Sequence, residues 1–468
     1  MTRSKIDTET LEKLKQAAGP GGWIEDDAGK AAYLDDFRGL YHGETPLVLR
    51  PADTQAVAAI LKICDAASIG VVPQGGNTGY CGGATPNPDG SEIVLSLARM
   101  NRIRDIDPLD NSITVEAGCV LADIQAAAEE VDRLFPLSLA AEGSCQIGGN
   151  LSTNAGGTAV LRYGNTRDLT LGLEVVLPDG QIWHGLRKLR KDNTGYDLKQ
   201  LFIGAEGTLG IVTAAVMKLY PRPREVSTAF VALRDATAAV TLLASAKAAS
   251  GDGTTTFEYM DRVCLDLVFD RDPDQQDPFG EAHGHYALIE MSAASEVMET
   301  MLGAAFEAGE IQDAVIASSG AQRSALWRLR ELIPESMNHA GGVIRHDVSV
   351  PVSMVPEFLD RARICARDTI DGVRIGPFGH IGDGNIHFNL VQPVGGDKAA
   401  FLARTHDIEV GIHDIATALE GSFSAEHGIG QLKRDELARY KSDIEQDQMR
   451  RIKQAFDPKG IMNPGKVL

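Results

Sequence analysis

The segment 73-PQGGNTGYCGG-83 follows a short apolar run and contains five glycines. Glycine allows the backbone to turn several N–H groups into one concavity, which suits a phosphate group. Asn77 and Thr78 can add side-chain donors to such a site. A wide glycine-rich turn without a ligand explains one loop of this kind equally well. The loop therefore predicts phosphate binding only if other segments share its character.

Two further segments do share it. The segment 142-EGSCQIGGNLSTNAGGTAVLRYGN-165 contains two glycine pairs, and 203-IGAEGTLGIVT-213 contains three glycines before an apolar run. Each glycine loses about 0.5–1 kcal/mol of backbone entropy relative to alanine, so three such loops are costly as mere turns. None has the spacing of a Rossmann or P-loop nucleotide site. The three loops favour one long, extended ligand that is held at several points.

Composition excludes several classes of function. A chain of 468 residues is long enough for two to four domains at about 100–200 residues each. The net charge of −20 opposes binding to nucleic acid or to an anionic membrane. The six cysteines show no metal-site or disulfide spacing, which fits a reducing compartment. No apolar leader or membrane-length run is present, so we expect a soluble cytoplasmic protein without a membrane span.

Apolar runs alternate with helical patterns up to Leu219, and the prolines of 221-PRPREV-226 indicate a domain boundary. The later part, with its alternating strands and helices, is typical of an α+β domain with helices on one face of a sheet. The predicted helices are an N-terminal polar helix, a helix capped by Asp53 that ends before Gly70, and 294–308, 355–367 and 443–456; the predicted strands are 71–72, 93–97, 113–115, 171–177, 211–219 and 285–292. The expected division is an N-terminal helical segment over 1–40, a first domain over 41–222, a second over 223–420 and a C-terminal segment over 421–468.

The segment 379-GHIGDGNIH-387 sets His380 and His387 seven positions apart. Its Gly-Asp-Gly sequence excludes a continuous helix, and one straight strand would put the two side chains on opposite faces. Only a turn would let both imidazoles reach one point, although an ordinary hairpin without a metal explains this segment as well. In 424-SAEHGIGQ-431, Glu426 and His427 add a carboxylate and an imidazole. Two histidines and one carboxylate with open positions are a common divalent-metal set, so the two segments together favour a metal site.

These blocks together resemble a known superfamily. The three glycine loops and LEVVLPDG at 173–180 resemble the FAD-binding (PCMH-type) domain of the vanillyl-alcohol oxidase superfamily. GHIGDGNIH, SAEHGIG and DPKGIMNPGK at 457–466 resemble its branch of D-lactate dehydrogenases, glycolate oxidase flavoprotein subunits and D-2-hydroxyglutarate dehydrogenases. The resemblance implies an α+β fold with a two-subdomain FAD-binding domain over 41–222 and an α+β substrate (cap) domain with an antiparallel sheet over 223–420. It also implies that the segment 421–468 returns to the FAD-binding domain.

The resemblance implies a non-covalent FAD, although Cys81 and Cys145 leave a covalent link open. The residues that it assigns to the cofactor are Pro73, Gly75, Gly76, Asn77, Thr78, Gly79, Gly82, Gly143, Ser144, Gly148, Gly149, Thr153, Asn154, Gly156, Gly157, Tyr163, Gly164, Glu206, Gly207, Gly210, Ile211 and Asn463.

The resemblance also assigns the reacting groups. His380, His387 and Glu426 match ligands of a divalent metal, with zinc expected before manganese, and His427 matches the catalytic base. Arg330, Arg345, Asn389 and His427 match substrate-binding positions. Two positions depart from the branch: Arg345 replaces a lysine and Pro334 replaces a threonine, which puts the identity of the substrate in doubt. We interpret Arg328, His283 and His285 as structural or surface residues.

The resulting prediction is an FAD-dependent D-2-hydroxyacid dehydrogenase. It would oxidise D-2-hydroxyglutarate to the 2-oxo acid, with a hydride passing to flavin N5 and a proton to His427; removal of the C2 proton first is the alternative order. D-lactate dehydrogenase and glycolate or 2-hydroxy-acid oxidase activities are the near alternatives. A flavin-free metal hydrolase and a non-catalytic flavin-binding subunit of an oxidase complex are the distant ones. Expected partners are the small 2-hydroxy acid and an electron acceptor such as an electron-transfer flavoprotein or a quinone, with a homodimer allowed and nucleic acid excluded.

Overall fold

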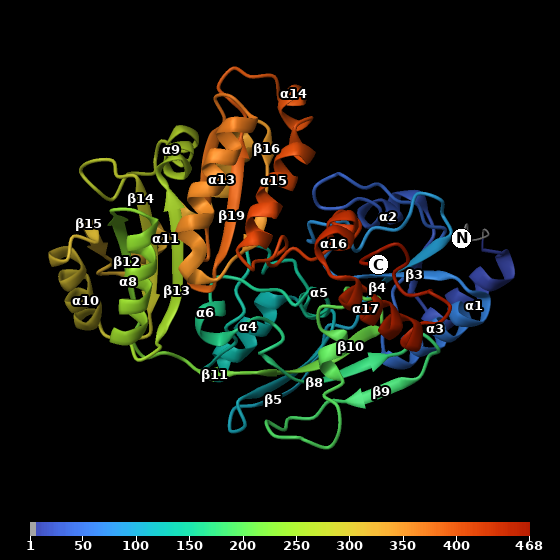
Figure 1. Cartoon of the computed structure of the whole chain (residues 1–468). Coiled ribbons are helices and arrows are strands. Elements are labelled where there is room, and N and C mark those ends of the chain that lie inside the picture. The colour runs from blue at the N-terminus through green and yellow to red at the C-terminus, as the bar shows by residue number, and fades with distance from the viewer. Residues whose placement is uncertain (1–5) are drawn as a thin grey trace. The chain divides into compact units, whose positions relative to one another are not determined.

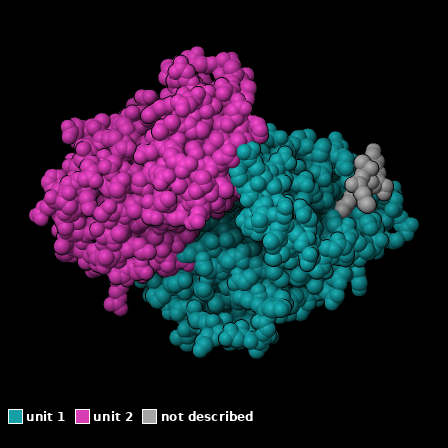
Figure 2. Space-filling view, viewed as in Figure 1, with its two compact units in different colours: residues 1–156, 164–222, 426–468 teal, residues 157–163, 223–425 magenta. Residues whose placement is uncertain are grey.

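The computed structural model describes residues 6–468 and divides into two compact units (Figures 1 and 2). Unit 1 comprises the chain up to Gly156 together with Gly164–Arg222 and Glu426–Leu468. Unit 2 comprises Gly157–Tyr163 and Pro223–Ala425. Each unit is therefore assembled from segments that lie far apart in the sequence.

A four-stranded sheet forms the first part of unit 1. Its strand order is β1 (Trp23–Ile24), β2 (Val48–Leu49), β4 (Glu92–Ser96) and β3 (Gly70–Gln74), and β4 is parallel to both β2 and β3. The helices α1 (Thr8–Ala18) and α3 (Thr54–Ala67) pack against each other beside it. The Asp53 side chain accepts a hydrogen bond from the Ala56 N–H, so the predicted cap of α3 is confirmed.

The second sheet of unit 1 is antiparallel. Its order is β5 (Ile103–Asp107), β6 (Ser112–Glu116), β10 (Ile211–Lys218), β8 (Thr170–Val176) and β9 (Ile182–Gly185), and a separate pair joins β7 (Arg133–Leu134) to β11 (Tyr220–Pro221). The other helices of unit 1 are α2 (Asp27–Lys30), α4 (Leu121–Glu130), α5 (Ile147–Thr153), α7 (Lys199–Phe202), α16 (Arg434–Tyr440) and α17 (Asp443–Phe456). The helix predicted at 443–456 is thus confirmed, and Ser442 and Glu445 cap its N-terminus reciprocally.

The C-terminal segment completes the first sheet. The N–H of Val71 in β3 donates to the Ile461 carbonyl, and the N–H of Asn463 donates to the Val71 carbonyl, both at 2.8 Å. Ile461 and Met462 are fully buried in the same core as α3. The segment predicted to return to the FAD-binding part of the chain does so.

Unit 2 is built on one antiparallel sheet. Its order is β15 (Ile311–Ile316), β12 (Ser227–Leu233), β14 (His285–Met291), β13 (Thr254–Asp261), β18 (Arg374–Gly379), β19 (Asn385–Val391) and β16 (Val343–Ile344), with β17 (Asp347–Ser349) also paired to β19. The helices of unit 2 are α6 (Val160–Tyr163), α8 (Ala236–Ala249), α9 (Arg262–Arg271), α10 (Ser295–Glu307), α11 (Gly320–Glu331), α12 (Ile333–His339), α13 (Val355–Thr369), α14 (Lys398–Leu402) and α15 (Thr405–Ala418).

Helices cover both faces of this sheet, and the expectation that they cover one face was wrong. Ala229 and Val231 of β12 point into a core with α8, α10, α13 and α15. Phe230 and Ala232, the alternate residues, point into a second core with α9, α11 and α12. Because every residue of β12 is buried, this strand shows no apolar–polar alternation from which to infer an open face. Among the described residues, no helix has the length and apolar character needed to cross a membrane.

Candidate active site

The first glycine loop, after β3, packs against the second. A Cβ on Gly76 would lie 2.1 Å from the Ser144 carbonyl oxygen, so only glycine allows this close approach. By contrast, no heavy atom lies within 4 Å of the Cβ position of Gly79, Gly143 or Gly149. These three glycines border open space, which is the cradle that an extended ligand needs.

Three buried acceptor atoms, two in the second loop and one in the C-terminal segment, have no hydrogen-bond partner among the described residues. Within residues 6–468, Oε1 of Gln146, Oδ1 of Asn150 and Oδ1 of Asn463 accept no hydrogen bond although they are buried. Such acceptors are costly unless a donor reaches them. A cofactor with N–H and O–H groups, such as FAD, supplies donors of this kind, so the residues present fit FAD. Sequence reasoning had missed Gln146 and Asn150, which lie inside the second loop.

Glu206, in the third loop, connects several segments of unit 1. Its carboxylate accepts hydrogen bonds from the N–H groups of Ile429 and Gly430, both at 2.8 Å. Its own N–H donates to the Ser152 carbonyl, and its carbonyl accepts from Nδ2 of Asn463, again at 2.8 Å. Burial raises the pKa of the Glu206 carboxyl group. Glu206 therefore holds the backbone that follows His427, and its predicted contact with the cofactor stays a prediction.

The other predicted cofactor-binding residues lie in or next to these loops. Asn77, Asn154 and Asn463 have positive φ angles of 53°, 51° and 43°, a conformation common in turns that gather backbone N–H groups. Pro73 packs where a Cβ on Gly207 would stand, 2.4 Å away. Gly75, Thr78, Gly82, Gly148, Thr153, Gly156, Gly164, Gly210 and Ile211 belong to unit 1, whereas Gly157 and Tyr163 belong to unit 2.

The loop that bears His427 is also held by the first glycine loop. The imidazole of His427 stacks on the Tyr80 ring, with centroids 4.6 Å apart and an interplanar angle of 15°. The N–H of Gln431 donates to the Cys81 carbonyl at 2.8 Å. Tyr80 was not among the predicted site residues, and no local pattern pairs it with His427. The stack fixes the plane of the imidazole that was predicted to act as a base.

The two histidines of GHIGDGNIH lie on a hairpin, as predicted. The strands β18 and β19 are antiparallel, and Gly384 turns between them with a φ of 83°. The imidazoles of His380 and His387 meet edge to face with centroids 5.6 Å apart. Nδ1 of His380 donates to the carboxylate of Glu258 at 2.5 Å. The turn therefore brings both rings to one side of the hairpin.

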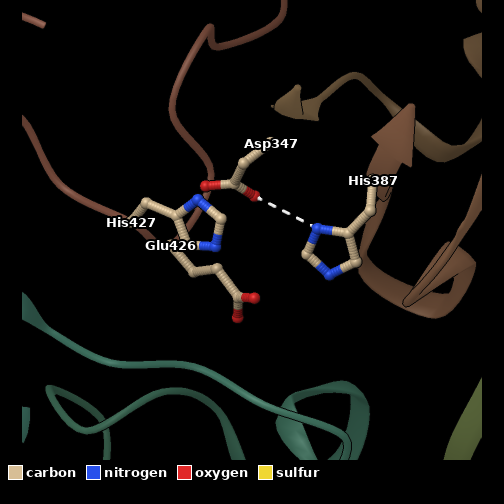
Figure 3. A group of neighbouring side chains, drawn as sticks. All are labelled: Asp347, His387, Glu426 and His427. Atoms are coloured by element: carbon tan, nitrogen blue, oxygen red, sulfur yellow. Dashed lines mark ion pairs between the residues drawn. The ribbon is translucent and has the colours of Figure 1, made fainter. Parts of the chain in front are cut away.

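Four side chains form a group suited to a metal ion: Asp347, His387, Glu426 and His427 each offer one ligand atom, and these atoms lie within 4.8 Å of one another (Figure 3). Nδ1 of His387 is 3.8 Å from Oδ1 of Asp347. Two imidazoles and two carboxylates suit zinc or manganese, so the donor set fits the predicted divalent ion. His387 and Glu426 were predicted as ligands. His380 lies beside this group rather than in it, and no sequence pattern indicated Asp347.

Arg330 is buried, unlike a solvated surface arginine. Its Nε donates to the Glu258 carboxylate at 2.7 Å, and its guanidinium lies over the Phe378 ring at 4.6 Å from the centroid. Burial alone would raise the pKa of the Glu258 carboxyl group, but His380 and Arg330 lower it to about 2. Glu258 is thus a carboxylate that joins a predicted metal ligand to a predicted substrate residue, and sequence reasoning missed it.

The other predicted substrate residues also belong to unit 2. Asn389 in β19 is buried, and its Nδ2 lies 3.6 Å from the Met337 sulfur. Arg345 is half-buried and donates to the Asn338 side chain. Pro334 stands in the first turn of α12, where its missing N–H leaves no hydrogen bond unmade. The predicted site residues of unit 2 thus gather around β18, β19 and the neighbouring α11 and α12.

The residues expected to be structural behave as such. Arg328 is 57% exposed and lies 3.6 Å from Asp272, which is a surface pair of little consequence. Nδ1 of His285 lies 2.7 Å from the Tyr259 hydroxyl group and 3.1 Å from Asp261. His283 is buried and precedes β14, whereas His285 is the first residue of that strand.

Comparison with known proteins extends this description. The chain matches the FAD binding domain family over residues 45–185 and the family of C-terminal domains of FAD linked oxidases over residues 222–467. The mitochondrial D-2-hydroxyglutarate dehydrogenase of Arabidopsis thaliana is 38% identical over 472 residues, which cover 99% of this chain and 82% of the relative. The D-2-hydroxyglutarate dehydrogenase of Xanthomonas citri is 38% identical over 421 residues, which cover 89% of this chain and 88% of the relative.

Solved structures agree on the fold. A p-cresol methylhydroxylase with substrate bound matches with a TM-score of 0.77 at 15% identity, over 98% of this chain and 96% of that chain. An alkyldihydroxyacetonephosphate synthase matches with a TM-score of 0.73 at 17% identity, over 99% and 87%. The predicted cytoplasmic location is not confirmed, since several relatives are named mitochondrial. The sequence identity over nearly the whole chain shows that this protein belongs to the family of FAD-linked oxidases that includes the D-2-hydroxyglutarate dehydrogenases.

Proposed function

We propose that this FAD-dependent hydroxyacid dehydrogenase oxidises D-2-hydroxyglutarate, or a near relative, to the 2-oxo acid with the help of a divalent cation. The observation that supports the proposal best is the group of Asp347, His387, Glu426 and His427, whose ligand atoms lie within 4.8 Å of one another. The relatives named D-2-hydroxyglutarate dehydrogenase support the choice of substrate.

His387, Glu426 and Asp347 would hold the cation, and His380, whose ring meets that of His387 on the same hairpin, would be the further ligand. A cation held by these residues would supply a Lewis acid that lowers the pKa of a nearby hydroxyl group. FAD supplies the two-electron acceptor when it is bound in the glycine loops. Oxidation of the substrate removes a hydride from C2 and a proton from the hydroxyl group, so that the C2–O bond becomes a carbonyl.

His427 would receive the hydroxyl proton. A base must lie within hydrogen-bond reach of that proton in a defined orientation. Two contacts within unit 1 hold the imidazole and its loop in place. Tyr80 stacks on the imidazole, and Glu206 binds the backbone N–H groups of Ile429 and Gly430. If the C2 proton leaves first instead, His427 can take that proton, because the same base serves both orders.

Arg330, Arg345 and Asn389 would bind the carboxylates of the substrate. Glu258 binds Nε of Arg330, and the two terminal amino groups of Arg330 make no hydrogen bond within residues 6–468. A guanidinium that is oriented in this way can bind a carboxylate with both terminal groups. A D-lactate dehydrogenase is the second candidate, because Pro334 and Arg345 alter the positions that would reach a distal carboxylate.

Anaerobic mixing of the purified flavoprotein with D- and L-2-hydroxy acids tests the proposal. We expect D-2-hydroxyglutarate to bleach the flavin faster than D-lactate or the L-enantiomers, and we expect a chelator to suppress bleaching and Zn²⁺ or Mn²⁺ to restore it. Full reduction by D-2-hydroxyglutarate after complete metal removal would contradict the role of the cation. Bound FAD that no 2-hydroxy acid bleaches would indicate a non-catalytic subunit, and a protein that cannot bind FAD would favour a hydrolase.

The cysteine pattern of the chain bears on which molecule takes the electrons from the flavin. None of the six cysteines has the spacing of an iron–sulfur site. Electrons must therefore leave the flavin for a separate carrier, for which an electron-transfer flavoprotein or a quinone is the proposed partner. Steady-state reduction of each acceptor with D-2-hydroxyglutarate as donor distinguishes them, and turnover supported by oxygen alone would make the protein an oxidase.

A further inference from the structure

Glu258 accepts two charged hydrogen bonds inside unit 2. Its side chain is fully buried in β13, where one oxygen accepts from Nε of Arg330 at 2.7 Å and the other from Nδ1 of His380 at 2.5 Å. A carboxylate that is removed from water needs such partners, because an unpaired buried charge is strongly unfavourable. One side chain therefore serves two residues that belong to different parts of the proposed site.

The contact with His380 sets the orientation of its imidazole. Since Nδ1–H donates to the carboxylate, the neutral ring presents its Nε2 lone pair on the opposite side. Carboxylates in this position fix the tautomer of metal-binding histidines and increase their basicity. The His380 ring meets the ring of His387, a member of the candidate metal group, with centroids 5.6 Å apart.

The contact with Arg330 sets the orientation of its guanidinium in the same way. The hydrogen bond at Nε and the contact with the Phe378 ring restrict the rotation of the planar guanidinium. The Phe378 ring in turn lies 5.1 Å from the ring of His387. Glu258, Arg330, Phe378, His380 and His387 thus form one continuous set of contacts.

We infer that Glu258 is a positioning residue that couples metal retention to substrate binding by holding His380 and Arg330 at the same time. This inference rests on the proposed roles of His380 and Arg330. If it is correct, loss of one carboxylate weakens two functions that otherwise depend on separate residues.

The test compares Glu258→Gln with a matched control, Glu290→Gln. Glu290 is a buried carboxylate on the neighbouring strand β14, where it binds Arg323 and the Thr228 hydroxyl group. Both substitutions remove the charge of a buried carboxylate that is paired with an arginine, but only Glu258 contacts the proposed site. Each purified flavoprotein is stripped with a chelator, titrated with Zn²⁺, and assayed with D-2-hydroxyglutarate at saturating Zn²⁺.

For Glu258→Gln we expect Zn²⁺ affinity to fall by about 10- to 100-fold, which is typical when the partner of a ligating histidine is lost. We expect KM for D-2-hydroxyglutarate to rise by about tenfold, as for the loss of one charge-assisted hydrogen bond. Glu258→Asp keeps the charge and should recover part of both losses. Glu290→Gln should lower Tm while Zn²⁺ affinity and KM stay at the wild-type values.

Wild-type Zn²⁺ affinity and KM in Glu258→Gln would overturn the inference, as would equal losses in Glu290→Gln. If Glu258→Gln does not fold, Arg330→Lys tests the coupling instead. This substitution alters a group that binds no metal, yet coupling predicts lower Zn²⁺ affinity than in the wild type, and an unchanged affinity would overturn it. Failure of the proposed function is distinguishable, because it shows as full turnover of the metal-free wild-type protein.

Discussion

Glu206 shows how one side chain can organise a catalytic loop from a distance. It is 223 and 224 residues away from Ile429 and Gly430, the two residues whose N–H groups it binds. Its φ of 50° is uncommon for a residue with a Cβ, and this backbone conformation is held by the bonds to Ser152 and Asn463. A motif within the third glycine loop could place Glu206 near the cofactor but could not reveal this second role.

Replacing Glu206 by glutamine should lower kcat while FAD stays bound. Glutamine keeps one acceptor oxygen but presents an N–H group to the other backbone donor, so the loop that carries His427 loosens. A misplaced base costs about 10- to 100-fold in kcat. Stopped-flow flavin reduction and the flavin content of the purified variant measure the two quantities.

Glu116→Gln is the control for this prediction, because Glu116 is a buried carboxylate of unit 1 that binds Arg102 and Arg104 rather than the loop that carries His427. It should lower Tm and leave kcat unchanged. A Glu206→Gln protein that turns over at the wild-type rate would contradict the positioning role, whereas loss of FAD would show that Glu206 contacts the cofactor directly.

Asp261 gives a pH-dependent contribution to the stability of unit 2. Burial would raise the pKa of its carboxyl group, but the hydrogen bond from His285 and the charge of Arg363 hold this pKa below the usual value. The carboxylate also accepts a hydrogen bond from the Tyr259 hydroxyl group at 2.6 Å. Because the pKa is lower in the folded state, the stability that Asp261 contributes is present above the unfolded pKa and is lost as the pH falls through the folded pKa.

Asp261→Asn should therefore destabilise the protein at neutral pH by about 3 kcal/mol, since it removes the nearer carboxylate partner of the mostly buried Arg363. The difference from the wild type should begin to shrink as the pH falls below the ordinary aspartate pKa of about 4, where the unfolded chain binds the proton, and should vanish only below the lower folded pKa. Urea unfolding over a series of pH values measures it. Asp266→Asn, at an exposed position of helix α9, which follows Asp261, should change stability by less than about 1 kcal/mol at every pH.

At the scale of elements, the hairpin of β18 and β19 was predictable because its signal is local. Gly382-Asp383-Gly384 excludes a helix, and the two flanking arms are apolar enough to form buried strands. The sheet around them was not predictable to the same degree. Strands with two buried faces show no alternation of apolar and polar residues, and no other sequence pattern indicates that helices cover both faces of the sheet.

Gly384→Ala should disrupt this hairpin. Its φ is 83°, and a Cβ would lie 2.0 Å from the Val350 carbonyl oxygen, so both the conformation and the space oppose a side chain. We expect a loss of about 3 kcal/mol together with weaker Zn²⁺ binding, because the turn sets the distance between His380 and His387. Chemical unfolding and Zn²⁺ titration measure the two effects.

Gly372→Ala is the matched control, since Gly372 also has a positive φ, 67°, but its nearest neighbour would be a Pro393 side-chain atom at 3.6 Å. It should cost about 1 kcal/mol and leave Zn²⁺ affinity unchanged. Equal losses in the two variants would show that backbone conformation alone, and not the contact with Val350, accounts for the effect.

At the scale of the whole molecule, each unit has its own apolar core. The core of unit 1 joins residues as distant as Leu14 and Met462, while Met291 belongs to a core of unit 2. The return of the C-terminal segment to β3 is therefore a condition for folding of unit 1, which also carries most of the predicted FAD contacts. FAD that binds only folded unit 1 should raise the unfolding temperature of that unit.

Met462→Ala and Met291→Ala test this division. Each removes a fully buried side chain and should cost about 2–5 kcal/mol. In calorimetry, Met462→Ala should lower the midpoint temperature of the unfolding transition that added FAD shifts upward. Met291→Ala should lower the midpoint temperature of the other transition. Equal shifts of one common transition by both variants would mean that the two units unfold together.

The features that were predictable from the sequence act over short separations along the chain. The Asp53 cap, the Gly-Asp-Gly turn, the glycine loops and the adjacent pair Glu426-His427 each depend on residues a few positions apart, where backbone sterics and hydrogen bonding limit the outcomes. The contacts of Glu258 with Arg330 and His380 span 72 and 122 residues, and that of Cys81 with Gly428 spans 347. Such partners, like Asp347 in the metal group and Tyr80 beside His427, become neighbours only through strand pairing and core packing. The physical reason is that a polar group in water can bond to water instead, whereas a buried polar group must find its partner within the protein.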